Sequence, residues 1–276
     1  MTGITEIQDA TDPRISAYVS VRERDLVGHG RRFVVEGELA LRVLVSQARY
    51  PIESVFVLNT RLPRLTPLLD SLSDGVAVYC APRQVMDGVV GFPIHRGVLA
   101  IGRRGAEPSP QELLSAAGLN DVVVGLIGMS NHDNVGGIFR NAAAFGARAV
   151  LLDAGSCDPL YRKAIRVSAG ASLTVPFARG GSADELLGEL AAAAYEIIGL
   201  SPQGRLTLDE VTFERPTALL FGAEGDGLPD DILSRVRSVR VPMAPGFDSL
   251  NVATASGIAL SRAYLARQRR EGRAQG

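Results

Sequence analysis

The feature that most constrains this fold is a series of short, fully apolar segments separated by longer helical patterns. The clearest is Val122-Val-Val-Gly-Leu-Ile127, which contains no polar residue. Such a run is typical of a strand buried on both faces in a parallel sheet. Strands that alternate with helices predict an α/β fold with a mostly parallel sheet flanked by helices. Further strands are expected at residues 33–36, 54–58, 76–79, 98–101, 149–152, 175–178, 196–200, 218–221 and 239–242.

A break in periodicity divides the chain. Residues 102–110 are polar, contain two prolines and interrupt every regular pattern, which is typical of a linker. We therefore expect an N-terminal domain at 1–102, a linker at 103–117 and a C-terminal domain at 118–276. Within the first domain we expect loose residues 1–13, a helix at 14–26 and a small, largely parallel sheet. In the second domain we expect single helices at 161–172 and 248–270.

Composition excludes several classes of protein. The 276 residues are 46% hydrophobic, which argues against disorder, and the net charge of −1 does not reveal a nucleic-acid partner. Nearly every cation is Arg, since Lys163 is the only lysine; codon bias and selection for phosphate binding both explain this. Cys80 and Cys157 form no disulfide framework and suggest a reducing cytoplasm. The chain shows no signal peptide and no apolar run of about 20 residues, so we expect no membrane partner.

No metal site is expected either. His29, His95 and His132 are scattered along the chain, and no His-x-x-x-His or Cys-x-x-Cys pattern occurs. We interpret His132 as a loop residue.

Three polar stretches follow predicted strands and are candidates for one shared site. They are Asn131–Gly146, Leu220–Pro229 and Val241–Gly257. Open α/β sheets bind ligands beyond the carboxyl ends of their strands, so we expect the three stretches to meet there. The third stretch also opens a long helical pattern, with Asp248 and Ser249 at the expected N-cap. The free N–H groups of a helix start favour an anion.

In order and composition, the three stretches resemble the signature motifs of the SpoU (TrmH) family of RNA ribose 2′-O-methyltransferases, part of the SPOUT class. One departure is that His132-Asp133 stands where the family usually has an Asp-Pro pair. The stretches 32–37 and 95–100 resemble the two ends of the family's N-terminal substrate-binding domain. The matching positions are Asn134, Gly136, Gly137 and Arg140 in the first motif; Gly222, Glu224, Gly225 and Gly227 in the second; and Pro242, Met243, Ser249, Leu250 and Asn251 in the third.

The resemblance implies a fold and an activity. It implies a trefoil knot in the C-terminal domain, an α/β/α N-terminal domain similar to RNA-binding ribosomal proteins, and a homodimer. It implies S-adenosylmethionine as the methyl donor and RNA as the substrate, with ribosomal RNA favoured over transfer RNA. It implies cofactor contacts at Gly222, Val241, Met243 and Leu250, and catalytic roles for Asn134, Arg140, Glu224, Ser249 and Asn251.

The five residues with implied catalytic roles are expected to act in different ways. The family's arginine is often proposed to activate the 2′-hydroxyl, but a guanidinium is a poor base. We expect Arg140 to bind the adjacent phosphate and to stabilise negative charge developing on oxygen. By resemblance, Ser249 helps to hold the phosphate and Asn251 organises the site. Glu224 either fixes the geometry of the loop or is a structural residue, and Asn134 can also be read as a simple N-cap.

Two other functions are possible for an α/β chain of this kind. A nicotinamide-dependent enzyme needs Gly-x-Gly-x-x-Gly after the first strand, and residues 125–137 lack that pattern. An RNA-binding or antibiotic-target-protecting protein of the same fold, without catalysis, is the alternative. The presence of Arg140, Ser249 and Asn251 argues against it.

Overall fold

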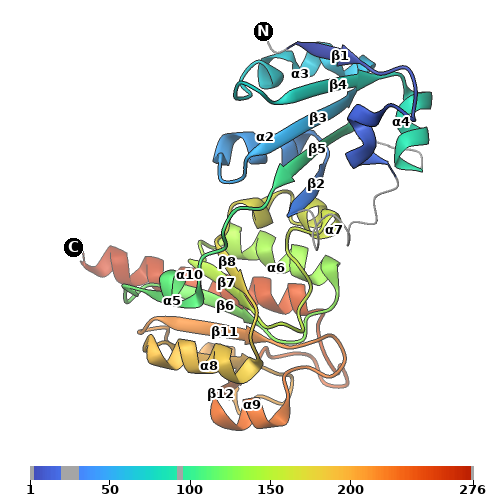
Figure 1. Ribbon diagram of the computed structural model, residues 1–276. Helices are drawn as coiled ribbons and strands as arrows, with labels where there is room; N and C mark the ends of the chain where they lie inside the picture. The colour runs from blue at the N-terminus through green and yellow to red at the C-terminus, as the bar shows by residue number, and fades with distance from the viewer. Residues whose placement is uncertain (1–2, 20–30, 92–95, 275–276) are drawn as a thin grey trace. The chain divides into compact units, whose positions relative to one another are not determined.

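The computed structural model describes residues 3–19, 31–91 and 96–274, which form two compact units (Figure 1). Unit 1 contains Met1–Ala106 and Leu160–Thr174, and unit 2 contains Glu107–Pro159 and Val175–Gly276. His29, His95 and residues 20–26 of the helix expected at 14–26 lie outside the described residues. None of the helices in the described residues is long and apolar enough to cross a membrane.

Unit 1 is built on a mixed sheet of five strands in the order β1-β4-β3-β5-β2. The first three strands of this order are parallel, whereas β5 is antiparallel to both β3 and β2. The expectation of a largely parallel sheet therefore holds for only part of it. The strands are β1 (Ile4–Glu6), β2 (Arg32–Glu36), β3 (Ile52–Leu58), β4 (Ala77–Ala81) and β5 (Val98–Arg103).

The first residues of the described chain correct the sequence prediction. Residues 4–6 form the edge strand β1, although a loose segment was predicted, because the buried Ile7 anchors them beside β4. The helix expected from residue 14 is a short 3-10 helix, η1 (Pro13–Tyr18), capped by Asp12. Its Ile15 and Tyr18 pack in the core beside Phe56. The remaining elements are α2 (Glu38–Gln47), η2 (Asn59–Arg61), α3 (Leu62–Leu69) and α4 (Arg83–Val90).

A segment from later in the chain also belongs to unit 1. Residues 160–174, placed by sequence order in the C-terminal domain, hold α7 (Arg162–Val167) and η3 (Ala171–Leu173), and α7 contacts β2. Arg162 donates to the buried carboxylate of Glu36 at 2.8 Å. The single helix expected at 161–172 is interrupted because Gly170 has a φ of +88°. A Cβ at Gly170 would lie 3.0 Å from that of Val43 on α2, so glycine permits this approach.

Unit 2 contains a sheet of seven strands in the order β10-β12-β9-β11-β6-β7-β8, and every pairing among the described residues is parallel. The chain runs from β6 outward to β8 and then crosses to β9 on the other side. The predicted α/β architecture with a parallel sheet is confirmed here. The strands are β6 (Val122–Leu126), β7 (Ala149–Leu152), β8 (Phe177–Arg179), β9 (Glu196–Leu200), β10 (Leu206–Thr207), β11 (Thr217–Phe221) and β12 (Arg237–Arg240).

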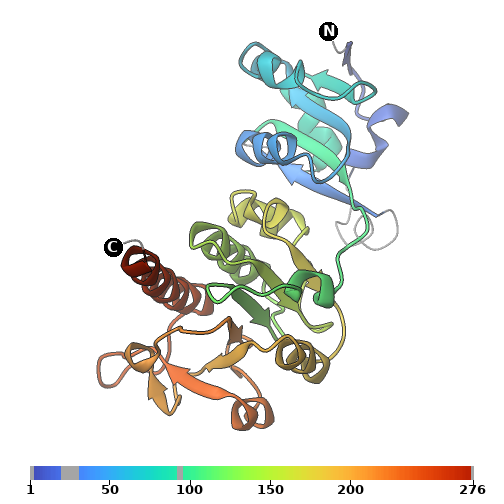
Figure 2. The same ribbon diagram turned by 90° about the vertical axis from the view of Figure 1, so that its left-hand side faces the viewer.

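Helices cover both faces of this sheet. On one face, α6 (His132–Ala144) and α10 (Val252–Ala274) lie side by side (Figures 1 and 2). Gly137 allows this close approach, because a Cβ there would lie 2.7 Å from that of Ala253. Asn141 strengthens the contact by donating to the Ala253 carbonyl at 2.7 Å. The other face packs against α5 (Pro110–Leu114), α8 (Ala183–Ala192) and α9 (Asp230–Arg235).

Candidate functional site

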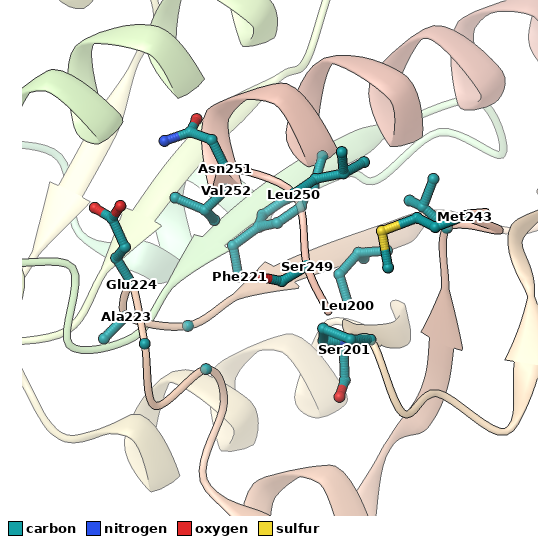
Figure 3. Close-up of a pocket in the computed structure, with 16 residues that line it drawn as sticks. Leu200, Ser201, Phe221, Ala223, Glu224, Met243, Ser249, Leu250, Asn251 and Val252 are labelled. Carbon is teal, nitrogen blue, oxygen red and sulfur yellow. The ribbon is translucent and has the colours of Figure 1, made fainter. Parts of the chain in front are cut away.

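A cavity of about 270 Å³ opens in unit 2 where three neighbouring parallel strands end. Figure 3 shows its lining, with Glu224 and Met243 at opposite ends and Leu250 between them. The lining comes from residues 200–202 after β9, 221–227 after β11, 241–243 after β12, and 249–255 at the start of α10. The second and third predicted motifs thus meet at one sheet edge, as expected of ligand sites in open α/β sheets.

The loop after β11 is tight because it folds back on itself. A Cβ at Gly222 would lie only 2.1 Å from the carbonyl carbon and oxygen of Gly227, so only glycine fits. The Gly227 N–H donates to the Ala223 carbonyl at 3.0 Å and closes the turn. Gly225 and Gly227 have φ values of +96° and +71°, which glycine adopts without strain. This loop forms one wall of the cavity with its backbone.

The opposite wall combines apolar side chains with free backbone donors. Leu200, Val241, Met243 and Leu250 supply the apolar surface. Within the described residues, the backbone N–H groups of Met243 and Leu250 make no hydrogen bond. A pocket with apolar walls and a few unpaired backbone donors suits a flat heterocycle with polar edges. Every predicted cofactor residue lines this cavity: Gly222, Val241, Met243 and Leu250.

A hydrogen-bonded chain of side chains joins all three motifs. Asn134, which is 3% exposed, donates through Nδ2 to Glu224 Oε2 at 2.9 Å. The Nδ2 of Asn251 donates to the Oδ1 of Asn134, also at 2.9 Å. Asn131 adds a second donor to Glu224 Oε2 at 3.2 Å. Glu224 and Asn251 line the cavity, whereas Asn134 lies behind them and connects the two.

Two predicted helix caps are wrong. Asn131, not Asn134, caps α6, because its Oδ1 accepts from the N–H of Asp133 at 2.9 Å. His132 is consequently the first residue of α6 and not a loop residue. Asn251 caps α10 by accepting from Ala253 N at 2.9 Å, so neither Asp248 nor Ser249 is the cap. In each case the Asn directly before the helix is the N-cap. Asn134 lies instead in the first turn of α6, and Asp248 and Ser249 lie in the loop before α10.

The structure separates Arg140 from the cavity. Arg140 is exposed on α6 and does not line the cavity, although Ser249 does. Arg140 lies six positions after Asn134, which corresponds to about 9 Å along a helix axis. Within the described part of the chain, Arg140 makes no hydrogen bond or ion pair, so its guanidinium is available to a partner molecule.

Several lining residues were missed by the sequence prediction. Leu200, Ser201 and Pro202 follow β9, and they reach the cavity because β9 lies between β11 and β12. The end of the predicted strand at 196–200 was a usable signal, but the order of strands was not known. Asn131 was missed although it stands directly before the helical pattern, where a cap is expected.

Other catalytic chemistries find little support. The cysteines Cys80 and Cys157 are free, and neither lines the cavity. Burial raises the pKa of the Cys157 thiol to about 11, so this thiol is protonated at neutral pH. Among residues 3–19, 31–91 and 96–274, no group of three or more His, Cys, Asp or Glu side chains is placed to hold a metal.

The pairing of Asn134 with Glu224 yields a prediction. Asn134→Asp replaces the amide donor with a second carboxylate facing Glu224, and we expect a loss of about 1–3 kcal/mol in the free energy of unfolding. Chemical denaturation measures this loss. The double variant Asn134→Asp/Glu224→Gln restores a donor opposite an acceptor with the roles exchanged, and we expect it to recover most of the stability. If the losses of the two single variants simply add, the hydrogen bond does not carry the coupling.

Comparison with known proteins places these features in a class. The sequence model described as the SpoU rRNA Methylase family matches residues 121–261. An uncharacterized tRNA/rRNA methyltransferase of Mycobacterium bovis is 38% identical over 267 residues, covering 93% of this chain and 90% of that protein. The chain belongs to the SpoU rRNA methylase family.

Solved structures share the fold across both units. A structure described as an AdoMet-bound rRNA methyltransferase from Sinorhizobium meliloti has a TM-score of 0.78 at 23% identity, covering 94% of this chain and 97% of that chain. A structure described as an RNA 2′-O ribose methyltransferase has a TM-score of 0.76 at 24% identity, covering 96% of this chain and all of that one. At such identities the similarity establishes the fold.

Proposed function

We propose that this protein transfers a methyl group from S-adenosylmethionine to a ribose 2′-hydroxyl of RNA, with ribosomal RNA as the preferred substrate. The observation that carries the proposal is the cavity at the ends of β9, β11 and β12, together with the hydrogen-bonded chain from Asn134 to Glu224 and Asn251. Membership of the family supports RNA as the substrate class.

The cavity fits an adenosine-containing donor. Gly222, Gly225 and Gly227 contribute bare backbone to one wall, which allows a flat ring to approach closely there. The backbone N–H groups of Met243 and Leu250 are available to its polar edges. Gly222, Val241, Met243 and Leu250 would hold the donor, which supplies an electrophilic methyl group when bound. The related Sinorhizobium structure, described as AdoMet-bound, supports this assignment by its fold.

The polar residues are assigned to the acceptor side. Asn131 and Asn134 fix Glu224 at one end of the cavity, and Asn251 in turn donates to Asn134. Ser249 also lines the cavity, and its hydroxyl can donate to a phosphate. Arg140 is free to bind the phosphate next to the reacting ribose and to stabilise negative charge developing on the 2′-oxygen. Transfer would form a bond from this oxygen to the methyl carbon and break the bond from that carbon to sulfur, which would leave as a neutral thioether, while the hydroxyl proton would pass to water.

The proposal also includes an oligomeric state and a cellular location. We assign the cytoplasm, where RNA is available and free thiols persist. We also assign a homodimer, supported by three apolar side chains on α10 that are exposed in the single chain: Ile258, Tyr264 and Leu265. Leu260 of the same helix is, in contrast, buried. The trefoil knot and an RNA-binding role for the N-terminal domain stay predictions.

One experiment tests this function directly. RNA from a strain that lacks this gene is incubated with the purified protein and methyl-labelled S-adenosylmethionine, and the ribosomal and transfer RNA fractions are separated. A 2′-O-methyl group blocks cleavage of the adjacent linkage by alkali, because that cleavage needs the free 2′-hydroxyl as nucleophile. We expect label in alkali-resistant dinucleotides from ribosomal RNA.

The other outcomes are equally informative. Label found on a base contradicts ribose transfer. RNA binding without label in either fraction supports the non-catalytic alternative. Label confined to transfer RNA overturns the substrate preference.

A further inference from the structure

Four arginines gather around one open concavity of unit 1. Among the described residues, its lining consists of Arg31, Arg32, Arg103 and Arg104. They come from the start of β2 and the end of β5, two strands that pair antiparallel. The carboxylate of Glu53 accepts from Arg32 Nε at 3.0 Å and from Arg103 Nε at 2.8 Å. Two of the four positive charges, those of Arg32 and Arg103, therefore share one negative charge.

The pairing of the strands makes this arrangement costly without a ligand. Arg32 and Arg103 are direct cross-strand partners, so their side chains leave the same face of the sheet. Like charges in this position are destabilising. Glu53 lies at a register irregularity between Ile52 and Ser54, and it uses a single oxygen, Oε2, for both arginines. The sheet therefore holds two guanidinium groups close together, and the single carboxylate of Glu53 offsets only one of their two positive charges.

The free ends of these side chains are open to an incoming anion. Arg32 and Arg103 are 37% and 61% exposed. Each uses Nε for Glu53, and their Nη groups make no hydrogen bond within the described residues. An Nη pair presents N–H groups in a planar fork that matches the oxygens of a phosphate.

The backbone fixes the neighbouring arginines. Arg31 has a φ of +48°, an unusual conformation for a side chain of this size. Its carbonyl accepts from Arg104 N at 2.7 Å, and its Nη2 donates to the Gly105 carbonyl at 2.8 Å. These bonds connect the entry to β2 with the exit from β5, so the concavity has a defined wall.

We propose that this arginine cluster, defined as Arg31, Arg32, Arg103 and Arg104, binds the phosphodiester backbone of RNA outside the reacting nucleotide. The inference rests on the proposed function for the identity of the polyanion. Phosphate contacts position a nucleic acid without reading its sequence, so the cluster sets affinity and register while other contacts set specificity. Direct contacts of this kind release counterions and make binding strongly salt-dependent.

The same unit offers a matched control. Arg42 and Arg64 are also exposed arginines that share one carboxylate, Glu38, at 2.8 and 3.2 Å. The variant Arg42→Gln/Arg64→Gln removes the same charge and disrupts the same type of pair as Arg32→Gln/Arg103→Gln. Any effect of net charge alone is therefore equal in the two double variants.

The test measures binding of full-length protein to fluorescein-labelled oligouridylate by fluorescence anisotropy across a range of salt concentrations. For Arg32→Gln/Arg103→Gln we expect binding at low salt about tenfold weaker and a log–log salt slope smaller by about 1.4, from two lost phosphate contacts. For the Arg42→Gln/Arg64→Gln control we expect the wild-type slope. Equal effects in the two double variants, or no effect in the first, overturn the proposal.

A second pair of variants avoids loss of the arginines themselves. Glu53→Gln removes the charge that competes with the anion, and we expect tighter oligouridylate binding, whereas Glu38→Gln leaves binding unchanged. Weaker or unchanged binding in Glu53→Gln overturns the proposal. Thermal unfolding of each variant confirms that the fold is retained.

Turnover separates this proposal from the function on which it rests. With ribosomal RNA we expect Arg32→Gln/Arg103→Gln to raise KM and to retain kcat, because a remote phosphate contact is made equally in the ground and transition states. If wild-type protein methylates ribose and both double variants behave alike, the cluster assignment fails. If wild-type protein does not methylate ribose but the cluster variants still lose binding, the proposed reaction fails and the cluster stands.

Discussion

Gly222→Ala is expected to abolish binding of S-adenosylmethionine, as measured by isothermal titration calorimetry. The added methyl group would lie 2.1 Å from the backbone of Gly227 and 2.2 Å from Leu228 N, well inside any van der Waals contact. Because these neighbours are backbone atoms, the loop after β11 must move as a whole. Its closing bond from Gly227 N to the Ala223 carbonyl is then lost. We expect destabilisation of about 1–3 kcal/mol from the overpacking itself.

Gly188→Ala is the matched control for this change. Gly188 is exposed on α8 in the same unit, and an added Cβ meets no atom within 4 Å. Alanine is the better helix former by about 0.5–1 kcal/mol, so this variant is expected to be slightly more stable and to bind normally. Normal binding of the donor by Gly222→Ala would show that the loop is not a wall of the donor site.

Arg140→Ala is expected to reduce kcat for methyl transfer by about 10²–10³-fold, the usual effect of removing a donor that stabilises developing negative charge. Binding of S-adenosylmethionine is expected to be unchanged, because Arg140 does not line the cavity. Arg140→Lys is expected to recover only part of the rate, since an ammonium group lacks the planar fork of a guanidinium. Single-turnover assays with saturating donor separate these effects.

The control for Arg140 is Arg235→Ala. Arg235 is an arginine of α9 that forms an exposed pair with Asp184, and its loss removes the same charge from the same unit. We expect the wild-type rate, because an exposed pair contributes little. A wild-type rate in Arg140→Lys would overturn the argument from fork geometry. Loss of donor binding in Arg140→Ala would instead assign this arginine to the cavity.

Local patterns predicted much of unit 2. The continuous apolar run at 122–127 indicated a buried parallel strand, and β6 lies inside the sheet between β11 and β7. The sequence did not predict the order of the strands, because an apolar run carries no information about which strands it pairs with. For that reason Leu200, Ser201 and Pro202 were missed as cavity residues although the strand before them was predicted. The two-residue strand β10 was missed because it is too short for any periodic signal.

The motifs predicted which residues line the cavity better than they predicted how the polar residues are connected. Gly222 and Leu250 line the cavity because backbone conformation and apolar character are local properties. The partnership of Asn134 with Glu224 joins residues 90 positions apart, which spacing alone does not reveal. Likewise, the separation of Arg140 from the cavity depends on where α6 begins, because each further residue adds about 1.5 Å along the helix axis.

Because residues 160–174 belong to unit 1, a single cut in the chain does not separate the two units. The backbone crosses the boundary after Ala106, after Pro159 and after Thr174, where a simple tandem arrangement would cross once. A fragment that stops at Ala106 loses Arg162 and Arg166, the two cations beside the buried Glu36. Removing the partners of a buried charge costs about 3–5 kcal/mol. A recombination event that exchanges the coding region for residues 1–106 must therefore also exchange the region for residues 160–174. We accordingly expect the two units to be inherited together.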